Sequence, residues 1–164
     1  MNGSEFYELK LSLALGKGRG HTHSDAKEVA PVDAKLKHLE MLQGVINRMA
    51  GNSFLLKGWC VTLVSALLGL AASGSDKRFV LLAYYPALMF WILDGYYLRQ
   101  ERLFRKLYDK VRLSAETPID FSMNTGPFDR DVGSWVAVMV SRTLAFFYIT
   151  ILGAILAVKL LTTG

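Results

Sequence analysis

Two charged residues, Asp94 and Arg142, interrupt long apolar stretches of this chain. Asp94 is the single charge within residues 79–98, and Arg142 lies within residues 135–161. A charge inside an apolar layer is costly unless it is paired or faces water. The sequence therefore predicts an ion pair between Asp94 and Arg142, or a position for both residues on a water-filled path or at a subunit contact.

Three tyrosines of residues 79–98 are polar enough to share that path or contact: Tyr84, Tyr85 and Tyr96. Pro86 directly follows two of them. Because proline removes a backbone N–H and crowds the preceding turn of a helix, we expect Pro86 to act as a hinge for the inner half of this segment.

The residue types of catalytic and metal sites do not assemble in this sequence. His21, His23 and His38 all precede the apolar stretches, whereas Cys60 lies inside one, so a nucleophile does not meet a base and an orienting acid. A single His-x-His pair without further ligands is weak evidence for a metal, and the basic glycine segment of residues 16–20 lacks the spacing of a phosphate-binding loop. We expect neither an enzyme nor a bound cofactor or metal.

The composition places these residues in a membrane. The chain of 164 residues is 52% hydrophobic and only 20% charged, which is too apolar for an ordinary soluble domain. A bilayer core of about 30 Å needs about 20 apolar residues to cross it. We therefore predict an all-α membrane protein with three transmembrane helices, at residues 54–73, 79–98 and 135–161.

Small side chains recur at intervals of four in the first and third predicted spans. Such ridges allow two helix backbones to approach closely. The pattern fits packing between spans of one chain and fits oligomer formation equally well. The residues concerned are Ser65, Gly69 and Ser73 in the first span, and Gly153 and Ala157 in the third.

The chain ahead of the spans has two parts. Residues 1–32 form an N-terminal segment that is either flexible or bears a short β-strand, because residues 7–15 alternate between apolar and polar side chains. The helical membrane domain of residues 33–164 then begins with an amphipathic helix at residues 33–50, which ends at a break over residues 51–53. Its apolar stripe suits the headgroup region, a neighbouring subunit or the chain's own cytosolic helices.

The second span has no helix breaker at its inner end. Residues 99–113 are therefore predicted to continue its helix as a cytosolic extension, and residues 114–134 form a loop. Four basic residues of the extension are placed to bind anionic lipid headgroups: Arg99, Arg102, Arg105 and Lys106.

The distribution of basic residues predicts the orientation in the membrane. All of the 19 Lys and Arg residues except Lys77, Arg78 and Lys159 lie toward one side of the three spans. Basic residues favour the cytoplasmic side, so we expect a cytoplasmic N-terminus and a C-terminus on the opposite side. The same asymmetry explains the net charge of +5 without direct binding to nucleic acid, which we do not expect.

Residues 37–112 resemble a known class of membrane proteins. The runs KHLEMLQGVINRMAGNSFLLKGWCVTLVSALLGLAA and FVLLAYYPALMFWILDGYYLRQERLFRKLYDKVR form a leading helix, a tight transmembrane hairpin and a long cytosolic helical extension. This layout is similar to that of the SLATT class of membrane effectors in prokaryotic anti-phage conflict systems. The resemblance implies a pore-forming effector of abortive infection that a cytosolic partner or signal controls. It also implies that the membrane is the bacterial inner membrane, with the N-terminus in the cytoplasm and the C-terminus in the periplasm.

Two functions are compatible with this layout. A protomer with three spans is too small to enclose an ion channel alone, so an effector that permeabilises or depolarises the membrane requires a homo-oligomer. The alternative is a membrane anchor that conducts nothing and recruits or restrains a soluble partner. In either case the expected partners are membrane lipids, further copies of the chain and a cytosolic regulatory protein that contacts the N-terminal segment and the cytosolic helices.

Overall fold

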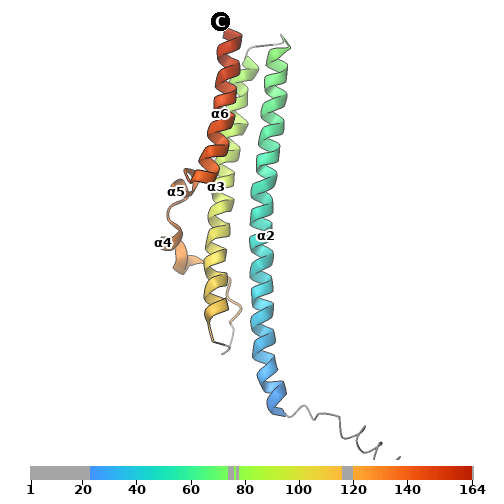
Figure 1. Ribbon diagram of the computed structural model, residues 1–164, viewed down its shortest axis with the longest axis vertical. Coiled ribbons are helices and arrows are strands. Elements are labelled where there is room, and N and C mark those ends of the chain that lie inside the picture. Colours follow the sequence, from blue (N-terminus) through green and yellow to red (C-terminus); the bar gives the residue numbers. More distant parts are fainter. Residues whose placement is uncertain (1–22, 74–75, 77, 116–119, 164) are drawn as a thin grey trace, which may run out of the picture.

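The computed structural model describes residues 23–73, 76, 78–115 and 120–163, and Figure 1 shows their arrangement. These residues form helices and their connections, and within them there is no strand. The strand predicted at residues 7–15 lies outside the described residues. Three helices are long and apolar enough to cross a membrane: α2 (His23–Ala72), α3 (Arg78–Leu113) and α6 (Arg142–Thr163).

Helices α2 and α3 form a long antiparallel hairpin (Figure 1). α2 has 50 residues and is therefore about 75 Å long at about 1.5 Å per residue. It begins ahead of the predicted start at residue 33, because residues 26–28 (Ala-Lys-Glu) are good helix formers.

The predicted helix break at residues 51–53 was wrong, since α2 passes through them. A glycine inside a helix costs about 1 kcal/mol relative to alanine. That cost is offset because α2 packs on α3 both before this point, through Leu42, and after it, through Cys60. The hydroxyl of Ser53 does not cap a new helix but bonds to α3.

Helix α3 continues past Leu98 to Leu113, which confirms that the second apolar stretch and its charged continuation form a single helix. Pro86 lies inside α3 and is buried, and the helix runs through it. The hinge function of Pro86 stays a prediction.

The chain returns along α3 through three short elements. η1 (Gly126–Phe128) and α4 (Asp129–Val132) lie within the predicted loop of residues 114–134, and α5 (Trp135–Met139) precedes α6. The predicted continuous helix over residues 135–161 was wrong, because a turn at Val140 and Ser141 separates α5 from α6.

The break between α5 and α6 has a partner on α3. The indole Nε1 of Trp91 donates a hydrogen bond of 2.9 Å to the carbonyl oxygen of Met139, which satisfies the end of α5. Gly95, one turn further along α3, leaves the space that the side chains of Met139 and Trp135 occupy. α5 therefore packs against α3 and is not collinear with α6.

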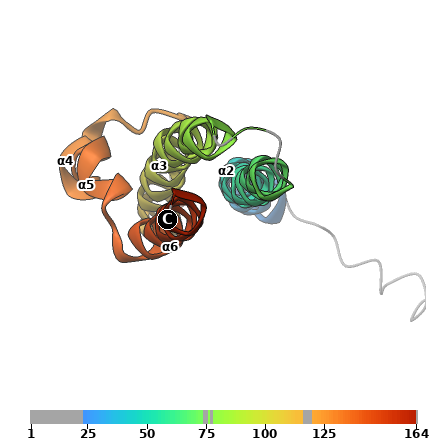
Figure 2. The same cartoon turned by 90° about the horizontal axis from the view of Figure 1, so that it is seen from above.

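The helices enclose two apolar clusters. The larger joins α2, α3 and α6, and its centre includes Cys60, Ala83 and Tyr148. The smaller, built from Leu42, Leu107 and Val111, joins α2 to the other end of α3 and is covered by the segment before α4. Figure 2 shows α6 beside α3, with α4 and α5 on the far side of α3 from α2.

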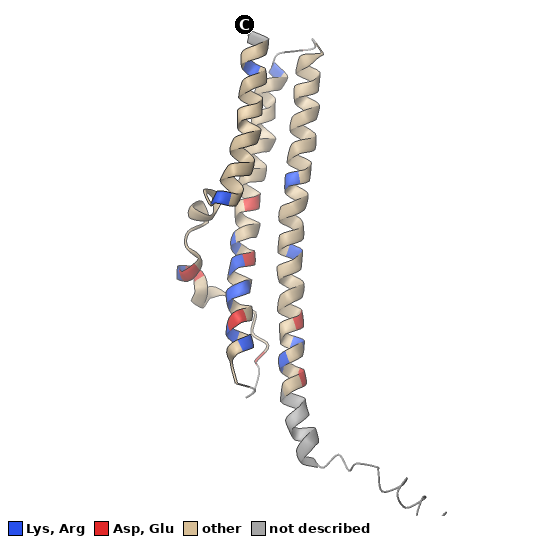
Figure 3. Ribbon diagram, in the orientation of Figure 1, with Lys and Arg blue, Asp and Glu red and all other residues tan. Residues whose placement is uncertain are grey.

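Charge divides the molecule along its length. Figure 3 shows Lys, Arg, Asp and Glu concentrated in the half of α2 and α3 that lies beyond α6, while the half shared by all three helices is almost free of charge. Most residues in the apolar half are not buried within the protomer, and large apolar side chains such as Trp59, Leu81 and Phe146 are exposed. This division suits a protein that is partly embedded in a membrane.

Candidate functional site

Asp94 is paired with Lys57 at the border between the apolar and the charged halves. The Nζ atom of Lys57 lies 2.5 Å from Oδ2 of Asp94, and the Asp94 side chain has no exposed surface. The Lys57 side chain is 23% exposed, so water reaches it only in part. The pair joins α2 to α3.

Two hydroxyl groups complete the surroundings of the Asp94 carboxylate. Ser53 lies one helical turn before Lys57 on the same face of α2, and its hydroxyl donates to Oδ1 of Asp94. Lys57 also donates to the Ser53 hydroxyl over 2.8 Å. From α6, the hydroxyl of Tyr148 donates to Oδ2 of Asp94 over 3.1 Å. We call these four residues, from three helices, the Asp94 cluster.

Aromatic contacts fix the side of the Asp94 cluster that α6 forms. The Tyr148 side chain is fully buried and stacks on Trp91, with ring centroids 5.7 Å apart and an angle of 9° between the rings. Phe147 meets the Tyr148 ring edge-on. Because Trp91 also bonds to Met139, the orientation of the Tyr148 hydroxyl depends on the packing of α5.

The Asp94 cluster is suited to holding helices together. Its carboxylate accepts hydrogen bonds from three side chains and is fully buried, so a substrate does not reach it in this conformation. A buried ion pair is costly to form, but removing one partner of such a pair costs about 3–5 kcal/mol because the other charge stays buried. Across the described ranges, no three His, Cys, Asp or Glu side chains gather in a way that would hold a metal.

The predicted ion pair between Asp94 and Arg142 was wrong. Arg142 is the first residue of α6, its side chain is exposed, and it has no salt bridge in the described part of the chain. Lys57 pairs with Asp94 instead of Arg142, because Lys57 lies on the face of α2 that is turned to α3. In this conformation Asp94 cannot face a water-filled path or another subunit, since it is covered within the protomer.

The three predicted tyrosines lie in different surroundings. Tyr84 is half-buried against the larger apolar cluster. Tyr85 is 66% exposed and lines an apolar groove between α2 and α3, which Pro86 also lines. Tyr96 is 50% exposed and meets the edge of Tyr97. Tyr85 and Tyr96 are therefore accessible to lipid or to a second copy of the chain.

Both small-residue ridges face outward. Their five members are exposed, and a side chain added at Gly69 or at Gly153 would meet no atom within 4 Å. Neither ridge is used for packing between the helices of one protomer. This leaves contact with lipid or with another subunit for Ser65, Gly69, Ser73, Gly153 and Ala157.

The four basic residues predicted to bind headgroups divide into two pairs. Arg99 is held by the chain, since it donates to Asp129 and to the carbonyl of Gly133. Arg105 forms a salt bridge with Glu101. Arg102 and Lys106 have no salt bridge to a described residue.

Sequence reasoning missed three members of the Asp94 cluster. In the sequence, Lys57 is a single basic residue near the start of the first predicted span, and Ser53 lies in the predicted break. A signal was present, because Ser53 and Lys57 are polar and four positions apart on one helical face. Tyr148 gives no such signal, since the sequence does not show which face of α6 meets α3.

Comparison of the chain with protein-family models, with curated proteins and with solved structures gave no match.

Proposed function

We propose that this protein is an oligomeric membrane effector that permeabilises or depolarises the bacterial inner membrane in anti-phage defence. The resemblance to the SLATT class supports the assignment to defence, with control by a cytosolic partner or signal. The distribution of Lys and Arg supports an orientation with the N-terminus in the cytoplasm and the C-terminus in the periplasm.

The observation that carries this proposal is a small, partly hydroxylated stripe on the outer face of α2. At about 3.6 residues per turn, its members lie on the face opposite the buried Cys60 and Val64. All of them are exposed in the protomer. The α2 stripe, as we call it, consists of Gly58, Thr62, Ser65, Gly69 and Ser73.

The α2 stripe is suited to close contact between subunits around a narrow path. Small residues let helix backbones approach, and hydroxyl groups provide polar atoms to an ion or to water. Because one protomer cannot enclose such a path, several copies must bring their stripes together around an axis. Tyr85 and Tyr96, which are exposed on α3, are available for contacts between neighbouring subunits.

The continuous α2 helix provides a mechanical route for control. It runs without a break from the charged half of the molecule into the apolar half, so a displacement of its charged end also moves the α2 stripe. The Asp94 cluster fixes α2 to α3 and α6 at the border between the two halves. We expect this cluster to hold the three helices as one unit during such a movement.

Ion flux across liposomes that contain the purified protein tests the proposal. We expect flux above background, and we expect loss of flux when a bulky side chain fills the α2 stripe at Gly69. Flux at background for the wild-type protein would instead support the alternative, an anchor that recruits or restrains a soluble partner. The segment of residues 120–128, which packs on the charged ends of α2 and α3, is the surface that an anchor would present.

A further inference from the structure

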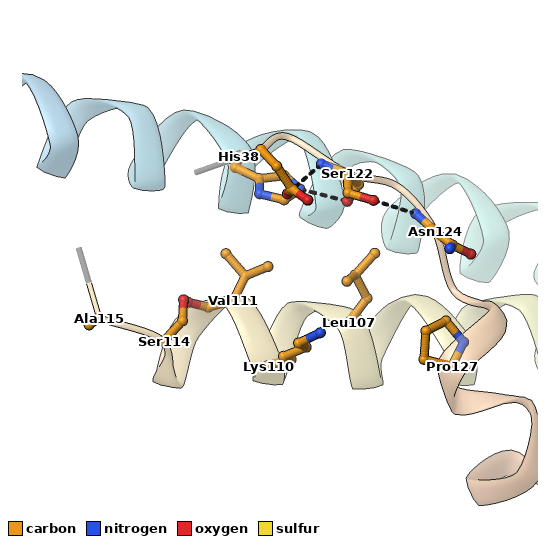
Figure 4. A pocket seen from close by; sticks show the side chains of 10 residues that line it. His38, Leu107, Lys110, Val111, Ser114, Ala115, Ser122, Asn124 and Pro127 are labelled. Atoms are coloured by element: carbon orange, nitrogen blue, oxygen red, sulfur yellow. Dashed lines mark hydrogen bonds between the residues drawn. The ribbon is translucent and has the colours of Figure 1, made fainter. Parts of the chain in front are cut away.

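A cavity of about 410 Å³ lies in the charged half of the molecule, between α2, the end of α3 and residues 120–127. Figure 4 shows Leu107 and Val111 of α3 on one side of it and His38 of α2 on the other. The remaining lining residues are mostly polar, with Ala115 and Pro127 as the apolar exceptions. The volume falls within the range of pockets that hold small organic ligands.

His38 carries a buried nitrogen that no described residue contacts through a hydrogen bond. The side chain is 1% exposed, and its Nε2 atom lies 3.1 Å from the carbonyl oxygen of Ser122. Because a carbonyl oxygen only accepts, Nε2 carries the proton and donates. In the neutral ring Nδ1 is then an acceptor, and it has no hydrogen-bond partner in the described part of the chain. A buried polar atom of this kind indicates a missing partner.

The other polar residues of the lining define the ligand further. Lys110 has no salt bridge to a described residue, and Lys35 adds a second positive charge at the same edge, where it donates to the carbonyl of Ser114. These two ammonium groups favour an anionic group on the ligand. The carboxylate of Asp120 and the Nδ1 atom of His38 are acceptors, so they favour a ligand that brings hydroxyl or N–H donors.

The backbone beside the cavity is strained at one residue. Phe121 has a φ of 52°, a conformation that aromatic side chains rarely adopt. Its ring packs against His38, with centroids 5.5 Å apart. Strain of this kind costs about 1–3 kcal/mol and is concentrated at ligand sites and switch regions. The neighbouring turn is fixed by Asp120, which accepts from the backbone N–H of Ser122.

The position of the cavity favours a soluble ligand over a lipid headgroup. His38 lies 19 positions before Lys57 in the same helix, hence about 28 Å from it along the axis. Lys57 already marks the border of the apolar half. A lipid headgroup at that border is therefore about 28 Å from His38 along the helix axis.

We propose that this cavity binds a small phosphorylated polyol from the cytosol, with its phosphate at Lys110 and its hydroxyl groups at His38 and Asp120. This inference goes beyond the proposed function, because binding requires no ion conduction, and it rests on that function only for the cytoplasmic position of the charged half. The positively charged edge holds the anion, the acceptors take the hydroxyl protons, and the apolar side formed by Leu107 and Val111 contacts the carbon skeleton.

The test is isothermal titration calorimetry, in which the full-length protein in detergent is titrated with each of three probes. Glucose 6-phosphate combines both parts of the proposed ligand, whereas inorganic phosphate and glucose each carry only one. We expect saturable binding of glucose 6-phosphate, at least about ten-fold tighter than that of either other probe. Equal binding of phosphate and glucose 6-phosphate, or no saturable binding of glucose 6-phosphate at millimolar concentration, would overturn the proposal.

Two variants and one lipid control locate the binding. Lys110→Gln should weaken binding of glucose 6-phosphate about ten-fold, whereas Lys37→Gln, which alters an exposed lysine that does not line the cavity, should not change it. His38→Gln provides a second variant on the other wall and should also weaken binding. Nanodiscs of phosphatidylglycerol should not displace glucose 6-phosphate. Displacement by that lipid, or equal effects of the two lysine variants, would contradict a soluble ligand at this site.

Discussion

The ammonium group of Lys57 on α2 lies 2.5 Å from the carboxylate of Asp94 on α3, and the Asp94 side chain is completely covered. The hydroxyl of Tyr148 extends this contact to α6. The three helices that are long enough to cross a membrane therefore meet at one carboxylate. This contact stabilises the arrangement that presents the α2 stripe on the outside of the protomer.

Asp94→Ala should lower the free energy of unfolding by about 3–5 kcal/mol, because it leaves the Lys57 ammonium group without its partner. Unfolding in mixed detergent micelles measures this loss. The double variant Asp94→Leu with Lys57→Leu should be more stable than either single variant, since it removes both charges together. Additive losses in the double variant would show that the two side chains are not coupled.

Arg142→Ala should change the free energy of unfolding by no more than about 0.5 kcal/mol, because the side chain is exposed and has no salt bridge to a described residue. The same unfolding measurement applies. A loss of unfolding free energy as large as that of Asp94→Ala would instead support the ion pair between Asp94 and Arg142 that the sequence predicts.

Gly95→Ala should destabilise the protein by about 1–3 kcal/mol, because a methyl group at this position collides with the Met139 side chain. The cost should fall when Met139→Ala is already present. Gly153→Ala is the matched control, since a methyl group there meets nothing within 4 Å and favours the helix. Equal melting temperatures for the Gly95 and Gly153 variants would contradict the close packing of α5 on α3.

The spans could be predicted from the sequence because length and hydropathy are sufficient to identify them. The interruption at Val140 could not, because it depends on a hydrogen bond from Trp91 on another helix. The continuity of α2 through Gly51 and Asn52 was missed for a related reason. Local propensity favours a break there, and packing of α2 on α3 overrides it.

The candidate site was predicted in part. Asp94 is recognisable as a lone charge in an apolar stretch, but its partner depends on how the faces of α2, α3 and α6 are turned. The small-residue ridge on α2 was visible from its spacing alone. Its outward direction follows only from which residues of α2 are buried, such as Cys60 and Val64.

One pair of variants separates the effect of the α2 stripe from that of other exposed residues of α2. Gly69→Leu places a large side chain within the stripe, whereas Val61→Leu enlarges an exposed residue of the same helix outside it. Both proteins should insert and unfold like the wild type, because both sites are exposed in the protomer. A difference in function between them would then report on contacts between subunits.

The most direct measurement is ion flux from liposomes that contain equal amounts of the wild-type protein, Gly69→Leu or Val61→Leu. We expect flux above background for the wild type and for Val61→Leu, and flux reduced to background for Gly69→Leu. Background flux for the wild-type protein, or undiminished flux for Gly69→Leu, would contradict this expectation.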